Sequence, residues 1–293
     1  MKNKDNLMVY KANQVVEASY KLTLNEQRVV LACIAQVHSR EALLTTDEFE
    51  LSAKDFAKFF SVSEDRAYHS LIEVAESLFN RYVVIDNPYL DRPKIKRIKM
   101  RWISSIEYLT DEGKIALCFS KKMLPYLSEL QGQFTRYELK HVGNMTSIYG
   151  IRLYELLMQW RTTQVRVIEV DSLKRQFEIE NKYSAIKDFK KYVIDPAIKD
   201  INEHSNYDVT WNQKKTGRSV THLIFEFKEK ESAPSLVKVK KQKTKNKDDN
   251  DDKNGVIIDN IEYFADMRKK YGDAVTKAIP ADMIELLKSQ GRW

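Results

Sequence analysis

The chain has 293 residues, of which 43% are hydrophobic, so it can form two domains of ordinary size, each with its own core. Lys and Arg number 49 against 42 Asp and Glu, and this net charge of +7 is too modest to establish nucleic-acid binding unless the basic residues are clustered. Two cysteines argue against a disulfide framework, and the sequence contains neither an apolar signal segment nor an apolar run of about 18 residues. We therefore expect a cytoplasmic protein with free thiols and no membrane partner.

The first predicted helix follows a polar start, residues 1–20, which we expect to be flexible. Residues 22–39 have an apolar face, and Thr23 with Glu26 three residues later has the spacing of a capping box. A helix of this kind, largely buried, opens the first predicted domain, residues 21–134.

A helix-turn-helix is predicted next. Ser52 caps residues 53–60, Ser63 caps residues 64–80, and only Ser61 and Val62 lie between the first helix and the cap of the second. The second helix presents three polar residues near its start, and these are candidate DNA contacts: Arg66, His69 and Ser70. An ordinary helix pair is an equal alternative, because Glu73 and Glu76 follow on the same side and confine any contact to the first turns.

Strands are predicted over residues 82–86, 94–109 and 114–119, with a turn at residues 110–113, and together they form a first wing. Arg97, Lys99 and Arg101 fall on one face by the period of two. Such a stripe of like charge repels itself unless an anion such as a phosphate backbone lies along it. The alternative is an edge strand protected by charge against aggregation.

The second half of the chain repeats this order. Residues 120–134 are expected to form a short helix that links the halves. A largely buried helix follows over residues 147–160, begun by Thr146 or Ser147. A short strand is predicted over residues 165–170, and then a short helix over residues 173–177, capped by Asp171 or Ser172.

The most informative stretch is Tyr183–Ser205, which we interpret as a long recognition helix. Its apolar positions share one face at a period of 3.6 residues and should be buried: Ile186, Phe189, Val193, Ala197 and Ile201. The candidate DNA contacts lie off that face or at its start: Tyr183, Ser184, Lys187, Lys190 and Lys191. Pro196 should bend or loosen the helix at Asp195. The alternative is an amphipathic helix whose lysines are merely solvated.

A second wing follows, made of strands at residues 207–211 and 219–227 and a polar loop that carries Lys214, Lys215 and Arg218. The fold class is therefore α+β, with two tandem winged-helix domains, the second at residues 135–228. Residues 229–254 have the composition of a charged disordered linker, and residues 255–293 that of a small helical tail.

Catalysis is not expected. The histidines, at positions 38, 69, 141, 204 and 222, never fall two apart, so the metal-binding His-hydrophobe-His pair of a DNA-nicking enzyme is missing. The sequence also lacks a phosphate-binding GxxxxGK[ST] loop and HExxH or CxxC metal motifs. We expect no catalytic residue, no cofactor and no metal.

Four segments resemble the plasmid replication initiators of the Rep_3 superfamily, with coverage from about Val9 to Phe227: LTLNEQRVVLACI, SIYGIRLYELLMQW, YSAIKDFKKYVIDPAIKDIN and GRSVTHLIFEF. The resemblance implies two winged helices related by pseudo-symmetry, of which the second makes the dominant DNA contacts, here through Lys187, Lys190, Lys191 and Arg218. It implies binding to directly repeated origin sequences (iterons) as a monomer, melting of nearby A·T-rich DNA, recruitment of the host initiator and replicative helicase, and repression of its own gene as a dimer.

Two other functions remain open from the residues alone. A sequence-specific transcription regulator with no replication role would use the same winged helices. An adaptor would use them for protein contacts. The duplicated module and the lack of a ligand-binding domain favour an initiator.

Overall fold

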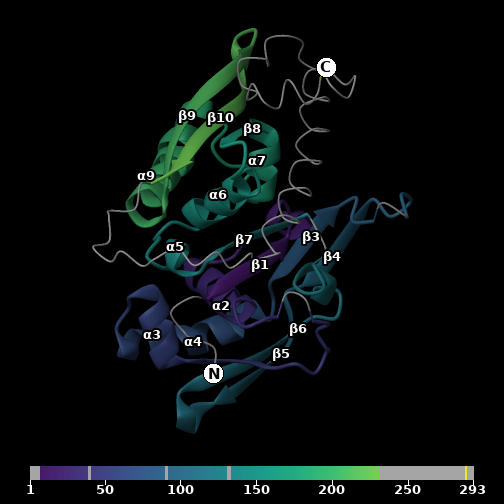
Figure 1. Cartoon of the computed structure of the whole chain (residues 1–293), viewed down its shortest axis with the longest axis vertical. Coiled ribbons are helices and arrows are strands. Elements are labelled where there is room, and N and C mark those ends of the chain that lie inside the picture. Colours follow the sequence, from purple (N-terminus) through teal and green to yellow (C-terminus); the bar gives the residue numbers. More distant parts are fainter. Residues whose placement is uncertain (1–6, 39–40, 90–91, 131–132, 231–287, 289–293) are drawn as a thin grey trace, which may run out of the picture.

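The computed structural model describes residues 7–38, 41–89, 92–130, 133–230 and 288. The predicted linker and helical tail fall almost entirely outside these ranges. Two modules, one toward each end of the long axis, are connected through a small sheet between them (Figure 1). No helix in the described part of the chain combines the length and apolar character needed to cross a bilayer.

The first module is a winged helix. Thr23 and Glu26 form the predicted capping box of its first helix, and the Ser52 hydroxyl accepts from the backbone N–H of Asp55. Its three-stranded antiparallel sheet has the order β2-β6-β5. The elements are α2 (Leu24–Ile34), β2 (Phe49–Ser52), α3 (Ala53–Phe60), α4 (Glu64–Leu78), β5 (Ile103–Leu109), the 3₁₀ turn η1 (Thr110–Glu112) and β6 (Lys114–Phe119).

The second module has the same topology, with its sheet in the order β8-β10-β9. In both modules the strand before the helix-turn-helix pairs with the second strand of the hairpin, so the predicted duplication of architecture and the fold class are confirmed. The elements are α6 (Ile148–Met158), β8 (Val165–Glu169), α7 (Val170–Gln176), α8 (Ile186–Phe189), a π-helical turn η3 (Lys190–Ile194), α9 (Asp195–His204), β9 (Tyr207–Thr216) and β10 (Ser219–Glu229).

The start of the chain differs from the prediction. Residues 7–20 are not flexible, because β1 (Met8–Ala12) pairs with β7 (Phe134–Glu138) and continues into α1 (Asn13–Val16). Val9, Val15 and Val16 are fully buried. The prediction failed because the partner strand lies far along the chain, and local composition carries no sign of it.

Two further elements were predicted wrongly. In the described part of residues 120–134 no linking helix forms; Pro125 lies within a short 3₁₀ turn, η2 (Leu124–Tyr126), and β7 follows. The long strand predicted at residues 94–109 is two strands, β4 (Arg97–Arg101) and β5, which separate at the fully buried Trp102. β4 pairs with β3 (Tyr82–Asp86) in a sheet of its own, outside the first wing.

Helix α6 connects the two modules. Its Glu155 is fully buried and accepts hydrogen bonds from Lys11 Nζ of β1 at 2.5 Å and from the Tyr137 hydroxyl of β7 at 2.6 Å. Burial, together with this carboxylate, raises the pKa of Tyr137. At the N-terminus of α6, after the short α5 (Lys140–Gly143), the Asp200 carboxylate of α9 accepts from the backbone N–H groups of Thr146 and Ser147.

Candidate nucleic-acid interface

The predicted recognition helix exists, and its orientation is as predicted. Phe189, Val193 and Ile194 are fully buried, whereas Lys187 and Lys191 are exposed. The helix begins at Ile186 rather than at Tyr183. Its loosening before Pro196 takes the form of the π-helical turn η3, because proline lacks the N–H that would bond to the carbonyl four residues earlier.

Lys190 is placed differently from its two neighbours. Its Nζ donates to Gln213 Oε1 on β9 at 3.1 Å and lies 5.8 Å from the centre of the Trp211 ring. The Trp211 indole N–H in turn donates to Asp195 Oδ1 at 3.2 Å. Lys190 therefore joins the helix to the wing, while Lys187 and Lys191 face solvent.

A residue just before the helix, Tyr183, and one within η3, Tyr192, form an aromatic pair that sequence reasoning missed in part. The Tyr183 ring stacks on Tyr192 at 6.2 Å with an interplanar angle of 27°, and Tyr192 is 54% exposed. Tyr183 has a positive φ of 53°, and its carbonyl accepts from Lys174 Nζ at 2.9 Å, while Ser184 is exposed. The signal for Tyr192 was an aromatic residue off the apolar stripe, beside Lys191.

The second wing is longer than predicted. Lys214 and Lys215 are part of β9, opposite His222 and Val220, so they do not lie in a loop. Only the turn at Gly217 and Arg218 protrudes, with Gly217 at a φ of 61° and Arg218 exposed. The local composition of this segment predicts a polar loop. It is a strand because it pairs with β10.

The first helix-turn-helix presents only two of its three predicted contacts outward. Arg66 and His69 are exposed on α4, but the Ser70 hydroxyl accepts from Asn25 Nδ2 of α2 at 3.2 Å. Further along α4 the Glu76 carboxylate accepts from the Tyr108 hydroxyl at 3.0 Å, and burial with this contact raises the pKa of Tyr108. Acidic groups thus occupy this face of the helix beyond its first turns, as predicted.

The predicted basic stripe forms one exposed face of β4. Arg97 Nε donates to Asp86 Oδ1 at 2.6 Å, and this hydrogen bond raises the pKa of Arg97. Lys99 Nζ lies 3.5 Å from the centre of the Tyr82 ring. Arg101 donates to the carbonyl oxygen of Phe79 at the end of α4. The stripe therefore belongs to the β3–β4 hairpin, beside the first helix-turn-helix.

Comparison with known families identifies both modules. The model for the initiator replication protein, WH1, matches residues 8–158, and the model for the initiator Rep protein, WH2, matches residues 169–227. The chain belongs to the initiator replication protein family. The first match includes α6, which sequence reasoning had placed in the second domain.

Individual relatives of this initiator family agree. A replication initiation protein of Escherichia coli is 29% identical over 287 residues, which cover 95% of this chain and 87% of that protein. The PI protein of Escherichia coli is 25% identical over 245 residues, covering 73% and 80% of the two chains. Among solved structures, the Pi initiator protein in complex with iteron DNA superimposes with a TM-score of 0.67 at 25% identity, covering 78% of this chain and 99% of that one.

Proposed function

We propose that this protein initiates plasmid replication by binding directly repeated origin sequences, the iterons, through its two winged helices. Membership of the initiator replication protein family supports this proposal, as does the similarity over 78% of this chain to the Pi initiator protein solved in complex with iteron DNA. The observation that carries it is the exposure of Lys187 and Lys191 on a helix whose opposite face is fully buried.

The geometry suits major-groove binding by the second module. The first turns of α8 and η3 enter the groove, where Lys187 and Lys191 reach base edges or phosphates. Lys190 fixes the angle between this helix and the wing, whose exposed Arg218 reaches the flanking backbone. Tyr192 adds a flat apolar surface beside Lys191.

The first module supplies a second contact region on the same duplex. Arg66 on α4 and the stripe on β4 carry positive charge that phosphates would neutralise, and the exposed His69 offers a hydrogen-bond donor. Two linked modules gain avidity only if both sites lie on one duplex at a matching separation. We therefore propose that the protein occupies a long binding site on the DNA. It acts there by binding alone and neither forms nor breaks a covalent bond.

Further parts of the proposal concern partners. By family membership we propose that the protein acts in the cytoplasm, promotes melting of A·T-rich DNA near the repeats, and recruits the host initiator and replicative helicase. A dimer of the same chain would bind an inverted repeat and repress its own gene, which places monomers and dimers in competition for the origin.

Footprinting of the full chain on the DNA flanking its own gene tests this function. Direct repeats predict a ladder of protected segments spaced by about one or two helical turns. The double variant Lys187→Glu with Lys191→Glu should lose the ladder. It should keep the unfolding transition of the parent, which shows that the loss is not caused by unfolding. A single symmetric patch, with no ladder at any protein concentration, would instead support a transcription regulator without a replication role.

A further inference from the structure

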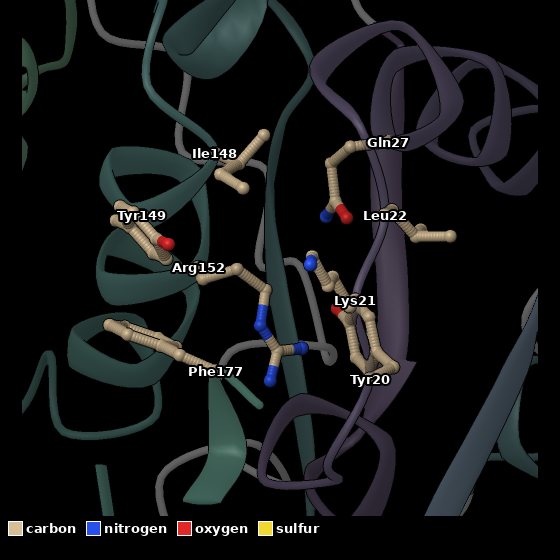
Figure 2. A pocket seen from close by; sticks show the side chains of 8 residues that line it. All are labelled: Tyr20, Lys21, Leu22, Gln27, Ile148, Tyr149, Arg152 and Phe177. Atoms are coloured by element: carbon tan, nitrogen blue, oxygen red, sulfur yellow. The ribbon is translucent and has the colours of Figure 1, made fainter. Parts of the chain in front are cut away.

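A small pocket lies where the segment before α2 and the first turns of α2 meet α6 and α7 (Figure 2). It is thus formed by parts of the chain on both sides of the module junction. The residues that matter to its chemistry are Tyr20, Lys21, Gln27, Tyr149, Arg152 and Phe177.

Two buried polar side chains in this pocket have unused hydrogen-bond donors. Arg152 is 5% exposed and donates through Nη2 to the carbonyl oxygens of Ala18, at 2.7 Å, and Gln176, at 3.2 Å. Its Nε and Nη1 have no hydrogen-bond partner, and neither has Nε2 of Gln27, which is 2% exposed. Leaving buried donors of a cation unsatisfied is costly, so an acceptor is expected there.

The size and charge of the pocket define that acceptor. Its volume of about 20 Å³ exceeds the ~10–15 Å³ that one water-sized group needs, and the exposed Lys21 lies at its lining. Figure 2 shows the Lys21 ammonium pointing toward the Gln27 amide, with the Arg152 guanidinium below them over the Tyr20 ring, whose centre lies 3.5 Å from Arg152 Cζ. One oxygen atom therefore fits inside, with the remainder of its group outside near Lys21.

The charges of Lys21 and Arg152 also act on one acidic residue, Glu178. Burial raises the pKa of Glu178, and the charges of Lys21, Lys99 and Arg152 oppose that effect. Glu178 does not fill the role of the acceptor, since the Nε and Nη1 donors of Arg152 are unpartnered. The pocket itself therefore presents two cations and an amide donor.

We propose that this pocket binds a phosphate-type oxyanion. One oxygen accepts from Arg152 and from Gln27, and the remaining oxygens face Lys21. Because Gln27 lies on α2 of the first module and Arg152 on α6, the helix that connects the two modules, the bound anion joins α2 to α6 and stabilises the docked arrangement by mass action. The anion is either free in solution or a backbone phosphate of bound DNA.

Inorganic phosphate titrated into the full chain tests the site. Sodium chloride holds the ionic strength constant, and the readouts are the melting temperature and the NMR signal of the Arg152 Nε–H group. We expect a saturable rise in melting temperature and a matching shift of that signal. Lys21→Glu and Gln27→Glu should each raise the Kd for phosphate by at least about tenfold, because each variant loses one charge-assisted hydrogen bond to the anion.

Lys54→Glu is the matched control, because this exposed lysine on α3 undergoes the same change of charge. It should keep the Kd for phosphate of the parent. Lys21 is exposed, so its variant remains folded and informative even where Gln27→Glu does not fold. An Arg152 signal that phosphate leaves unmoved, or equal stabilisation of parent and Lys21→Glu, would show that only water occupies the pocket.

A second measurement separates the two sources. If a DNA backbone phosphate occupies the pocket, Lys21→Glu weakens duplex binding and free phosphate competes with DNA beyond the effect of equal chloride. If the anion is free, duplex affinity is the same in parent and variant while the Arg152 signal still shifts. Neither result depends on which DNA sequence the protein recognises, so failure of the iteron proposal leaves this test intact.

Discussion

Lys187 and Lys191 differ from Lys190 in what their ammonium groups can reach, because Lys190 is already bonded to Gln213. We expect Lys187→Ala and Lys191→Ala each to weaken binding to the cognate repeat by about 1–3 kcal/mol if a base edge is read, and by less if only a phosphate is touched. Affinity measured at one fixed salt concentration checks this. Lys228→Ala is the control. If Lys187→Ala and Lys191→Ala both bind as tightly as the parent, this face of the helix contacts solvent and not DNA.

Asp200 carries a structural prediction at the same scale. Its buried carboxylate accepts from the backbone N–H groups of Thr146 and Ser147, and a Cβ at Gly150 would lie 2.8 Å from its Oδ2. Asp200→Ala should lower the free energy of unfolding by about 2–3 kcal/mol, since it removes charge-assisted bonds at a helix N-terminus. Urea unfolding measures this. The exposed Asp208→Ala should change little, and equal effects would contradict the assignment.

At the scale of elements, the β3–β4 hairpin carries a basic stripe that suits either DNA binding or edge protection. Replacing Arg97, Lys99 and Arg101 together by Gln should weaken binding to many sequences alike and flatten the salt dependence. The slope of log K against log salt should fall by about 0.9 for each phosphate that the variant no longer neutralises. Binding of one cognate and one unrelated duplex across a salt series supplies the measurement.

The control for that hairpin is Arg97→Lys with Arg101→Lys, which keeps the charge and should keep the slope. A slope unchanged in the neutral variant would assign the stripe to edge protection. The contacts of Arg97 with Asp86 and of Lys99 with Tyr82 are compatible with both roles, since a hairpin face can hold its cations in place for either purpose.

At the scale of the whole molecule, the buried pair of Lys11 and Glu155 connects the first strand to α6. Lys11→Met alone should cost about 3–5 kcal/mol of unfolding free energy, because it leaves a buried carboxylate supported only by Tyr137. The double variant Lys11→Met with Glu155→Leu should cost less than the single one, since no charge is then left buried. A double-mutant cycle by urea unfolding gives both values, and a double variant worse than the single one would refute this account.

Local patterns were sufficient wherever a residue's neighbours in sequence are also its neighbours in space. The capping box at Thr23, the buried stripe from Phe189 to Ile201 and the duplicated order of elements are of this kind. The helix predicted to be capped by Asp171 or Ser172 instead begins at Val170 after Glu169, which makes no side-chain cap bond. Helix ends of this sort depend on packing as much as on the local residue type.

The amino-acid sequence by itself determined two winged helices in tandem and which face of the recognition helix is apolar, because a period of 3.6 residues leaves only one way to bury that face. Tertiary structure alone decided that β1 pairs with β7, that Lys190 bonds to the second wing and Ser70 to α2, and that the basic stripe lies outside the first wing. Each of these depends on a partner distant in the chain. Such partners cannot be inferred from local residue types, since any strand can pair with many others.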